Sequence, residues 1–143
     1  IYFFQDPIPY LQRVLDQKSY AFQSECKTEY PQEVCTGVMA FRNDIYSRNL
    51  LHDIQRYRTE TISAANDQVR MNWFLASDPI LMDKVFTLPE TIFLNGISGR
   101  ILLAEQQFEG SIGELSPILA HANWLVGIDK KIKFLDRVEK WLI

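Results

Sequence analysis

Short apolar segments alternate along this chain with longer segments of helical periodicity, and this alternation limits the fold more than any other feature. Short runs of branched and aromatic residues are typical of buried strands, whereas apolar residues three and four apart are typical of amphipathic helices. Strands interleaved with helices predict an α/β fold with a mixed, mostly parallel sheet flanked by helices. The expected strands are residues 1–4, 20–23, 36–41, 83–88 and 117–122, and the expected helices are 10–17, 45–62, 66–76 and 129–142.

The three longer helices are each expected to bury one apolar face. Asn43 and Asp44 are typical capping residues, so the long helix should begin directly after them. Residues 100–116 fit neither periodicity and predict a loop-rich excursion. The expected inward residues are Leu50, Leu51, Ile54 and Tyr57 in the first of these helices, Val69, Trp73 and Leu75 or Ala76 in the second, and Ile132, Leu135, Val138 and Leu142 in the last.

The composition is that of a globular protein and excludes several classes. The 143 residues are 47% hydrophobic and 23% charged, which argues against disorder, and their number suits a single domain. The net charge of −3 argues against a dedicated nucleic-acid-binding protein, which needs a basic face. No apolar run reaches the roughly 18 residues that a membrane-spanning helix needs. The apolar start at Ile1 suggests a segment of a longer protein.

The usual motifs of several enzyme classes are absent. There is no GxGxxG, Walker loop, GxSxG or HExxH, so hydride transfer, P-loop chemistry and serine hydrolysis lack their signatures. Cys26 and Cys35 lie nine residues apart without zinc-site spacing. They either form a disulfide bond, as in an oxidising compartment, or remain two buried thiols.

Polar residues that follow predicted buried strands are the first candidates for a binding site, because ligands of α/β sheets bind beyond the carboxyl ends of the strands. His121 ends one such strand and could ligate a metal. Asn123 and the Gly127 turn could present donors to an anion, and Lys130 adds positive charge at a helix start. The same residues are also consistent with a core histidine and an ordinary strand–helix turn.

Two further segments have a structural and a functional interpretation. Asn66, Asp67 and Gln68 at a helix start either cap the helix or point into a cleft, where they would meet a sugar hydroxyl or a developing positive charge. Thr36 and Gly37 mark either a tight strand entry or a place where a ligand approaches the backbone closely.

Taken together, these segments resemble the nucleotide-diphospho-sugar transferase family, glycosyltransferases of GT-A fold. The resemblance spans residues 1–142 and rests on their order: Asp6-Pro7, Cys35-Thr-Gly-Val-Met-Ala-Phe-Arg42, Asn66-Asp-Gln68 followed by Asn72, Asn95-Gly96, and His121-Ala-Asn-Trp-Leu-Val-Gly127 with Lys130. It implies transfer of a sugar from a nucleotide-sugar donor, most readily a UDP-sugar, to a hydroxyl-bearing acceptor.

The resemblance also implies roles for single residues. Asp67 and Gln68 match the catalytic pair near the transferred sugar, and His121 matches a ligand of the divalent metal, usually Mn²⁺, that neutralises the leaving diphosphate. Other residues match donor-binding positions: Thr36, Gly37, Asn66, Asn123, Gly127 and Lys130.

One family motif is not found. The Asp-x-Asp metal pair is absent from these residues, so the chain resembles the C-terminal portion of a catalytic domain whose nucleotide-binding part is missing. Two alternatives stay open: a non-catalytic carbohydrate- or protein-binding module of the same fold, and a hydrolase built on Asp67 and His121. For a eukaryotic member the resemblance implies the Golgi lumen, with an anchor upstream, and otherwise the cytoplasm.

Overall fold

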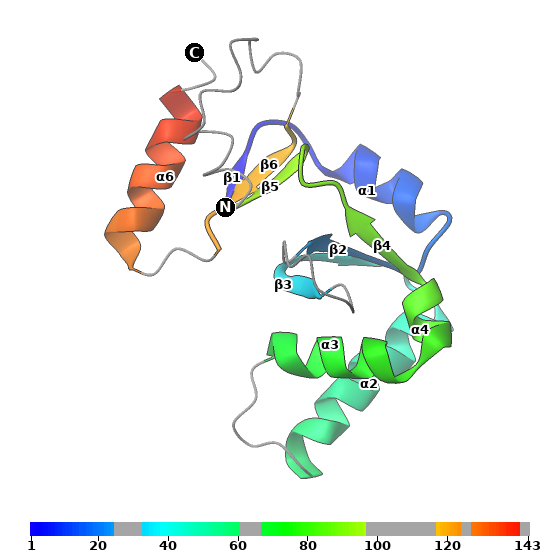
Figure 1. The fold of residues 1–143 in the computed structure, drawn as a ribbon. Coiled ribbons are helices and arrows are strands. Elements are labelled where there is room, and N and C mark those ends of the chain that lie inside the picture. Colours follow the sequence, from blue (N-terminus) through cyan, green and yellow to red (C-terminus); the bar gives the residue numbers. More distant parts are fainter. Residues whose placement is uncertain (25–32, 61–66, 97–116, 124–126, 141–143) are drawn as a thin grey trace. The chain divides into compact units, whose positions relative to one another are not determined.

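The computed structural model describes residues 1–24, 33–60, 67–96, 117–123 and 127–140 (Figure 1). The chain divides into two compact units. We call residues 8–87 the central unit, and residues 1–7 together with 88–143 the terminal unit. Within the described ranges, no helix is long and apolar enough to cross a membrane.

In its described residues, the central unit combines one small sheet with four helices. Its strands are ordered β3-β2-β4, and β2 and β3 pair antiparallel with Tyr20 opposite Phe41. The sheet therefore has β3 and β4 at its edges. The elements are α1 (Ile8–Leu15), β2 (Tyr20–Ser24), β3 (Val34–Phe41), α2 (Ile45–Glu60), α3 (Asp67–Ser77), α4 (Pro79–Asp83) and β4 (Val85–Leu88) (Figure 1).

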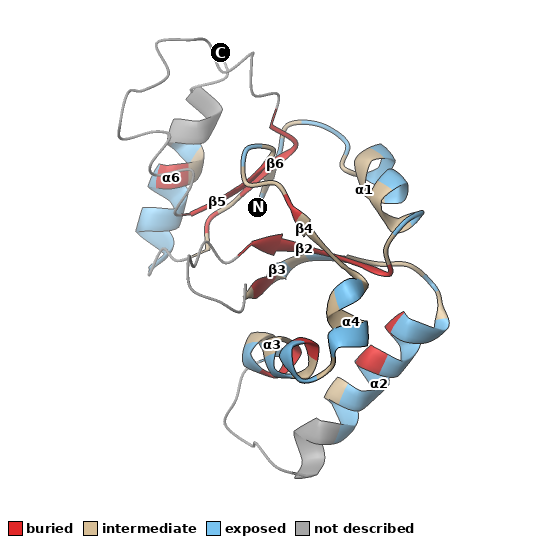
Figure 2. Cartoon of the chain, turned by 45° about the vertical axis from the view of Figure 1, so that its right-hand side comes forward, coloured by how far each residue is buried: buried red, intermediate tan, exposed pale blue. Residues whose placement is uncertain are grey.

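The core of the central unit lies between its sheet and its helices. Figure 2 shows buried residues on β2, at the start of β3, and on one side of α2 and α3. Burial of these large side chains is the main stabilising term for the unit, at roughly 1.5–3 kcal/mol for each. The buried members of the cluster are Tyr20, Phe22, Val34, Leu50, Met71 and Leu75.

Three expected core residues are exposed instead. Val69 and Trp73 on α3 are 53% and 47% exposed, and Leu51 on α2 is 44% exposed. Helix α3 buries Met71 and Leu75, which lie one turn apart on another of its faces. Periodicity predicted the helix and the burial of Leu75 correctly, but it placed Val69 and Trp73 inward in place of Met71, because apolar residues occur all around α3.

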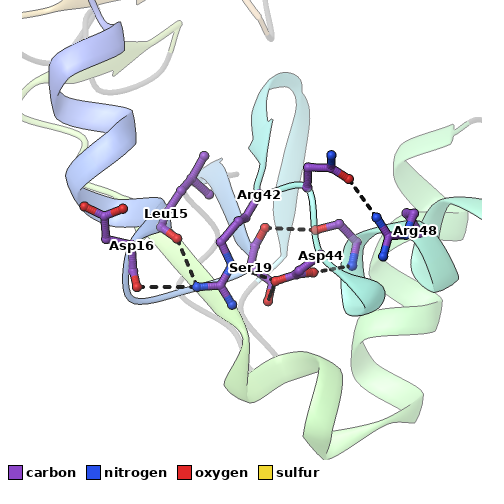
Figure 3. A network of polar contacts seen from close by, with 8 residues as sticks. Leu15, Asp16, Ser19, Arg42, Asp44 and Arg48 are labelled. Carbon is purple, nitrogen blue, oxygen red and sulfur yellow. Dashed lines mark hydrogen bonds and ion pairs between the residues drawn. The ribbon is translucent and has the colours of Figure 1, made fainter.

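A polar network joins the start of β2 to the start of α2 (Figure 3). Asp44 caps α2, as expected: its Oδ1 accepts from the Ser47 amide at 2.9 Å. Its Oδ2 accepts from the Ser19 hydroxyl at 2.7 Å and from Arg42 Nε at 2.8 Å. Arg42 also donates to the Leu15 carbonyl oxygen at 3.2 Å, so the network extends to the end of α1.

The terminal unit is a second small sheet covered by a helix. Its strands are β1 (Tyr2–Phe3), β5 (Phe93–Asn95) and β6 (Leu119–His121), in the order β1-β6-β5, and the helix is α6 (Ile128–Lys140). Leu94, Ala120, Ala122 and Phe134 form its buried cluster. Phe134 therefore takes the core position expected of Ile132, which is 49% exposed.

The α/β class is confirmed, but the mostly parallel sheet is wrong for the described strands. β5 and β6 pair parallel, whereas β1 pairs antiparallel with β6 and β2 with β3. Parallel neighbours need a long crossover connection, whereas antiparallel strands that follow each other closely need none. Helix α4 and strand β5 were not predicted. The loop around Cys26 and the 100–116 excursion lie outside the described residues.

Candidate functional site

Strand β3 is irregular at the predicted Thr36–Gly37 segment. Phe22 pairs with Met39, but the next residue of β2, Gln23, pairs with Cys35. The residues between these two pairing points, 36–38, therefore bulge out of the ladder. Bulges are frequent beside active sites, because they redirect side chains and free backbone groups from strand pairing.

The first turn of α3 is bonded to this bulge. Asp67 Oδ2 accepts from the Thr36 hydroxyl at 3.3 Å, and Gln68 Oε1 accepts from the Thr36 amide at 3.4 Å. The Gly37 amide donates to Cys35 Sγ at 3.4 Å. The structure thus brings together four of the predicted site residues, Thr36, Gly37, Asp67 and Gln68, from segments about 30 residues apart in the chain.

Asn72 holds α3 against the edge of the sheet just before the bulge. Its Oδ1 accepts from the Val34 amide at 2.7 Å, and its Nδ2 donates to the Val34 carbonyl oxygen at 2.9 Å. Nδ2 also donates to the Gln68 carbonyl oxygen at 3.0 Å. The Asn72 amide therefore satisfies both backbone groups of an edge-strand residue, as a neighbouring strand would.

The carboxylate of Asp67 and the hydroxyl of Thr36 form the polar surface of this group. Asp67 is exposed in the first turn of α3, where the helix dipole favours a negative charge. Gln68 is half-buried and its oxygen faces the Thr36 amide. A carboxylate beside a hydroxyl can accept hydrogen bonds from sugar hydroxyls or stabilise a developing positive charge. We call Thr36, Gly37, Asp67 and Gln68 the bulge site.

A second polar group lies in the terminal unit, where the parallel strands β5 and β6 end together. Asn95 stands opposite His121 in the register. The Gly96 amide donates to Asn123 Oδ1 at 2.7 Å, so the two chain segments that follow these strands are joined. A Cβ on Gly96 would lie 1.8 Å from the Asn123 carbonyl oxygen, so this close approach requires glycine.

His121 and the start of α6 carry the other predicted site residues of this unit. His121 is half-buried, and burial, followed by nearby positive charge including Lys131, lowers the pKa of its imidazole. Gly127 precedes α6 with a φ of +94°, and nothing lies within 4 Å of where its Cβ would be. Glycine is therefore required there by backbone conformation and not by close approach. Lys130 is exposed in the first turn of α6, where backbone amides favour an anion. We call His121, Asn123, Gly127 and Lys130 the strand-end group.

The described residues do not by themselves form a metal site. A structural or catalytic metal needs at least three protein ligands in most sites. Within the described ranges, no three His, Cys, Asp or Glu side chains are close enough to hold an ion. A neutral imidazole at His121 suits one coordination bond, but the remaining ligands would have to come from elsewhere.

The family resemblance included Asn72, Asn95 and Gly96 but assigned none of them a role, and the structure shows what each contacts or pairs with. Asn72 follows Gln68 by four residues, which puts both on neighbouring positions of one helix. Gly96 was interpreted only as part of a turn, and Asn95 was not linked to His121. Asn66 lies outside the described residues. Asn123 Oδ1 accepts a hydrogen bond from the Gly96 amide, and the expected donation by Asn123 to an anion stays a prediction.

Comparison with known proteins gives one match. The sequence model of the nucleotide-diphospho-sugar transferase family matches residues 1–135. No curated protein and no solved structure matches the chain significantly. The family match spans both the bulge site and the strand-end group.

Proposed function

The chain belongs to the nucleotide-diphospho-sugar transferase family, and on that premise we propose that it takes part in moving a sugar from a nucleotide-diphosphate donor to a hydroxyl group. The acceptor is a glycan, a protein or another hydroxyl compound. A UDP-sugar is the donor we would test first. The observation that carries the proposal is the contact of the Asp67 carboxylate with the Thr36 hydroxyl at a strand bulge.

In this proposal Asp67 acts on the transferred sugar. Its carboxylate would accept a hydrogen bond from a sugar hydroxyl, or stabilise the positive charge that develops at the sugar when the bond to the diphosphate weakens. Thr36 orients the carboxylate by donating to it. Gln68 supports the bulge through the Thr36 amide, and Gly37 lets the backbone approach the sugar closely.

The strand-end group is proposed to bind the donor diphosphate. Lys130 and the first-turn amides of α6 supply positive charge, and the Gly127 turn gives the diphosphate room. We also propose that a divalent cation binds here with His121 as one ligand, and Mn²⁺ is the first ion to test. Such an ion would neutralise charge on the leaving diphosphate. Its other ligands are proposed to lie outside the described residues.

The experiment that tests the sugar role is a transfer assay on the full-length protein with Asp67→Asn. This change keeps the size of the side chain and its ability to accept a hydrogen bond from Thr36, and it removes the negative charge. We expect kcat/KM to fall by about 100-fold or more, typical of losing one preorganised electrostatic group. Asp53→Asn is the matched control, since Asp53 is exposed in the middle of α2.

Two results would contradict the proposal. Activity of Asp67→Asn within about threefold of the control, or roughly 0.7 kcal/mol of barrier, would make Asp67 only a helix residue. Glycan binding that needs no metal, without any transfer, would favour the binding-module alternative.

The metal proposal has its own test. His121→Asn should raise the Mn²⁺ concentration needed for half-maximal activity, and an unchanged concentration would show that His121 is not a ligand of the metal.

A further inference from the structure

We propose that Asn72 is a positioning residue that sets the place of Asp67 relative to the transferred sugar. This inference rests on the proposed function of the bulge site. It concerns a residue that touches neither the Asp67 carboxylate nor the Thr36 hydroxyl in any contact shown. Asn72 acts instead on the two elements that carry these groups, β3 and α3.

The contacts form a closed loop from Asn72 to Asp67. Asn72 bonds to the amide and carbonyl of Val34 at 2.7 and 2.9 Å, which fixes α3 against the last regular part of β3 before the bulge. Two residues later, Thr36 donates from its amide to Gln68 and from its hydroxyl to Asp67. Asn72 closes the loop on the helix side through the Gln68 carbonyl at 3.0 Å.

The bonds of this loop are unequal in length. The contacts of Asn72 measure 2.7 to 3.0 Å, whereas those of Thr36 measure 3.3 and 3.4 Å. Bonds near 2.9 Å are strong and those beyond about 3.2 Å are weak. Asn72 therefore provides the tight attachment between helix and bulge, and the Asp67–Thr36 contact depends on it.

Asn72 itself has no amide hydrogen left for a substrate. Nδ2 carries two hydrogens, and they are used by the carbonyl oxygens of Val34 and Gln68. Val34 is 1% exposed, so its backbone groups need this partner within the protein. A role in positioning thus fits Asn72 better than direct contact with the sugar.

The first test compares Asn72→Asp with wild type in the full-length enzyme. The carboxylate keeps the acceptor for the Val34 amide but loses both donated bonds and faces two carbonyl oxygens. We expect kcat to fall by about 100-fold, the effect of misplacing a catalytic group by roughly 1 Å, with the donor KM changed less than about threefold. Asn49→Asp, at an exposed position of α2, is the matched control and should keep full activity.

All rates are divided by the concentration of folded protein. The folded fraction is measured by far-UV circular dichroism at the assay temperature. If Asn72→Asp does not fold, Asn72→Ser provides a neutral change that removes both bonds to Val34, because the serine hydroxyl is too short to reach them, and it should lower kcat by about tenfold or more. Faster amide hydrogen exchange at Thr36 should accompany either change, because the bulge loses its attachment. A kcat within about threefold of wild type in a folded variant overturns the proposal.

The second test asks whether Asn72 acts through Asp67. In the Asp67→Asn background, Asn72→Asp should lower kcat by less than about twofold, because the carboxylate that Asn72 positions has already been replaced by a neutral amide. If the losses in kcat from the two substitutions multiply, as they do for residues that act independently, the proposal is overturned. The outcomes are separable: full activity of Asp67→Asn contradicts the proposed function, whereas a large loss in Asp67→Asn with none in Asn72→Asp contradicts only the positioning role.

Discussion

Removing the Asp44 carboxylate should destabilise the central unit. Asp44→Ala deletes three accepted hydrogen bonds at once, from Ser47, Ser19 and Arg42 (Figure 3). These bonds connect the start of α2 to the residue just before β2 and to the residue just after β3, and Arg42 in turn donates to the Leu15 carbonyl oxygen at the end of α1. Three elements of the unit are therefore joined at one side chain.

The magnitude depends on the groups that each lost bond leaves behind. Loss of an N-cap costs about 1 kcal/mol. Ser19 is completely buried, and its hydroxyl would lose its acceptor, at a cost of about 1–3 kcal/mol. The side chain of Arg42 is 42% exposed, so water can replace its bond to Asp44 at little cost. The expected loss in the free energy of unfolding is about 2–4 kcal/mol.

The contribution of Asp44 should also depend on pH. Burial raises the pKa of this carboxyl, but the hydrogen bonds from Ser47, Ser19 and Arg42 outweigh burial and hold the pKa well below its usual range. The unfolded chain, with an Asp pKa near ~3.9, then binds the proton at higher pH than the folded chain. The stabilisation is complete above about pH 5 and is lost progressively as the pH falls below about 4.

Urea unfolding at pH 7 and at intervals down to pH 2.5, followed by far-UV circular dichroism, measures both effects. The gap in unfolding free energy between wild type and Asp44→Ala should be about 2–4 kcal/mol at pH 7 and should narrow toward pH 2.5. Asp53→Ala is the control and should stay within about 0.5 kcal/mol of wild type. A gap below about 0.5 kcal/mol at pH 7, or one that does not narrow in acid, would refute the reasoning.

Three other substitutions test single features of the structure. The Tyr20 hydroxyl is buried without a hydrogen-bond partner among the described residues, so Tyr20→Phe should be neutral or stabilise by about 1 kcal/mol in urea unfolding. Burial, with Asp44 and other nearby groups, raises the pKa of Tyr20 to about 12; wild type should lose stability between about pH 10 and 12, and Tyr20→Phe should lose less. Gly96→Ala should cost about 3 kcal/mol, because its Cβ would meet the Asn123 carbonyl oxygen; a thermal midpoint equal to wild type contradicts the close approach. Gly127→Ala should cost about 1–2 kcal/mol from backbone strain alone, measured in the same scans, and a cost as large as that of Gly96→Ala would show a steric contact that the structure lacks.

Local chemistry made much of the fold predictable. Pro79 separates α3 from α4, as expected of a residue that disfavours helix before it. Asp44 was predicted as a cap and is one, because a carboxylate one residue before a helix satisfies an amide of the first turn. Such features depend on neighbours in the chain and can be predicted without the fold.

Features set by distant residues were predicted less well. Trp73 was assigned to the core on spacing alone, yet α3 buries Met71 and Leu75 while Trp73 is 47% exposed. A mostly parallel sheet was also expected, whereas β2 and β3 pair antiparallel. Pairing depends on which strands meet, and a buried strand has the same apolar pattern in either direction.

The sequence by itself determined the family and the residue types that both polar groups contain. Asp67, Thr36 and His121 were chosen because of their chemistry and their places beside predicted elements. Only the tertiary structure decided that Thr36 meets Asp67, because a bulge displaces residues 36–38 from the ladder toward the start of α3. Only the tertiary structure decided that Asn72 fixes this meeting, because its amide finds an edge strand whose backbone groups need partners.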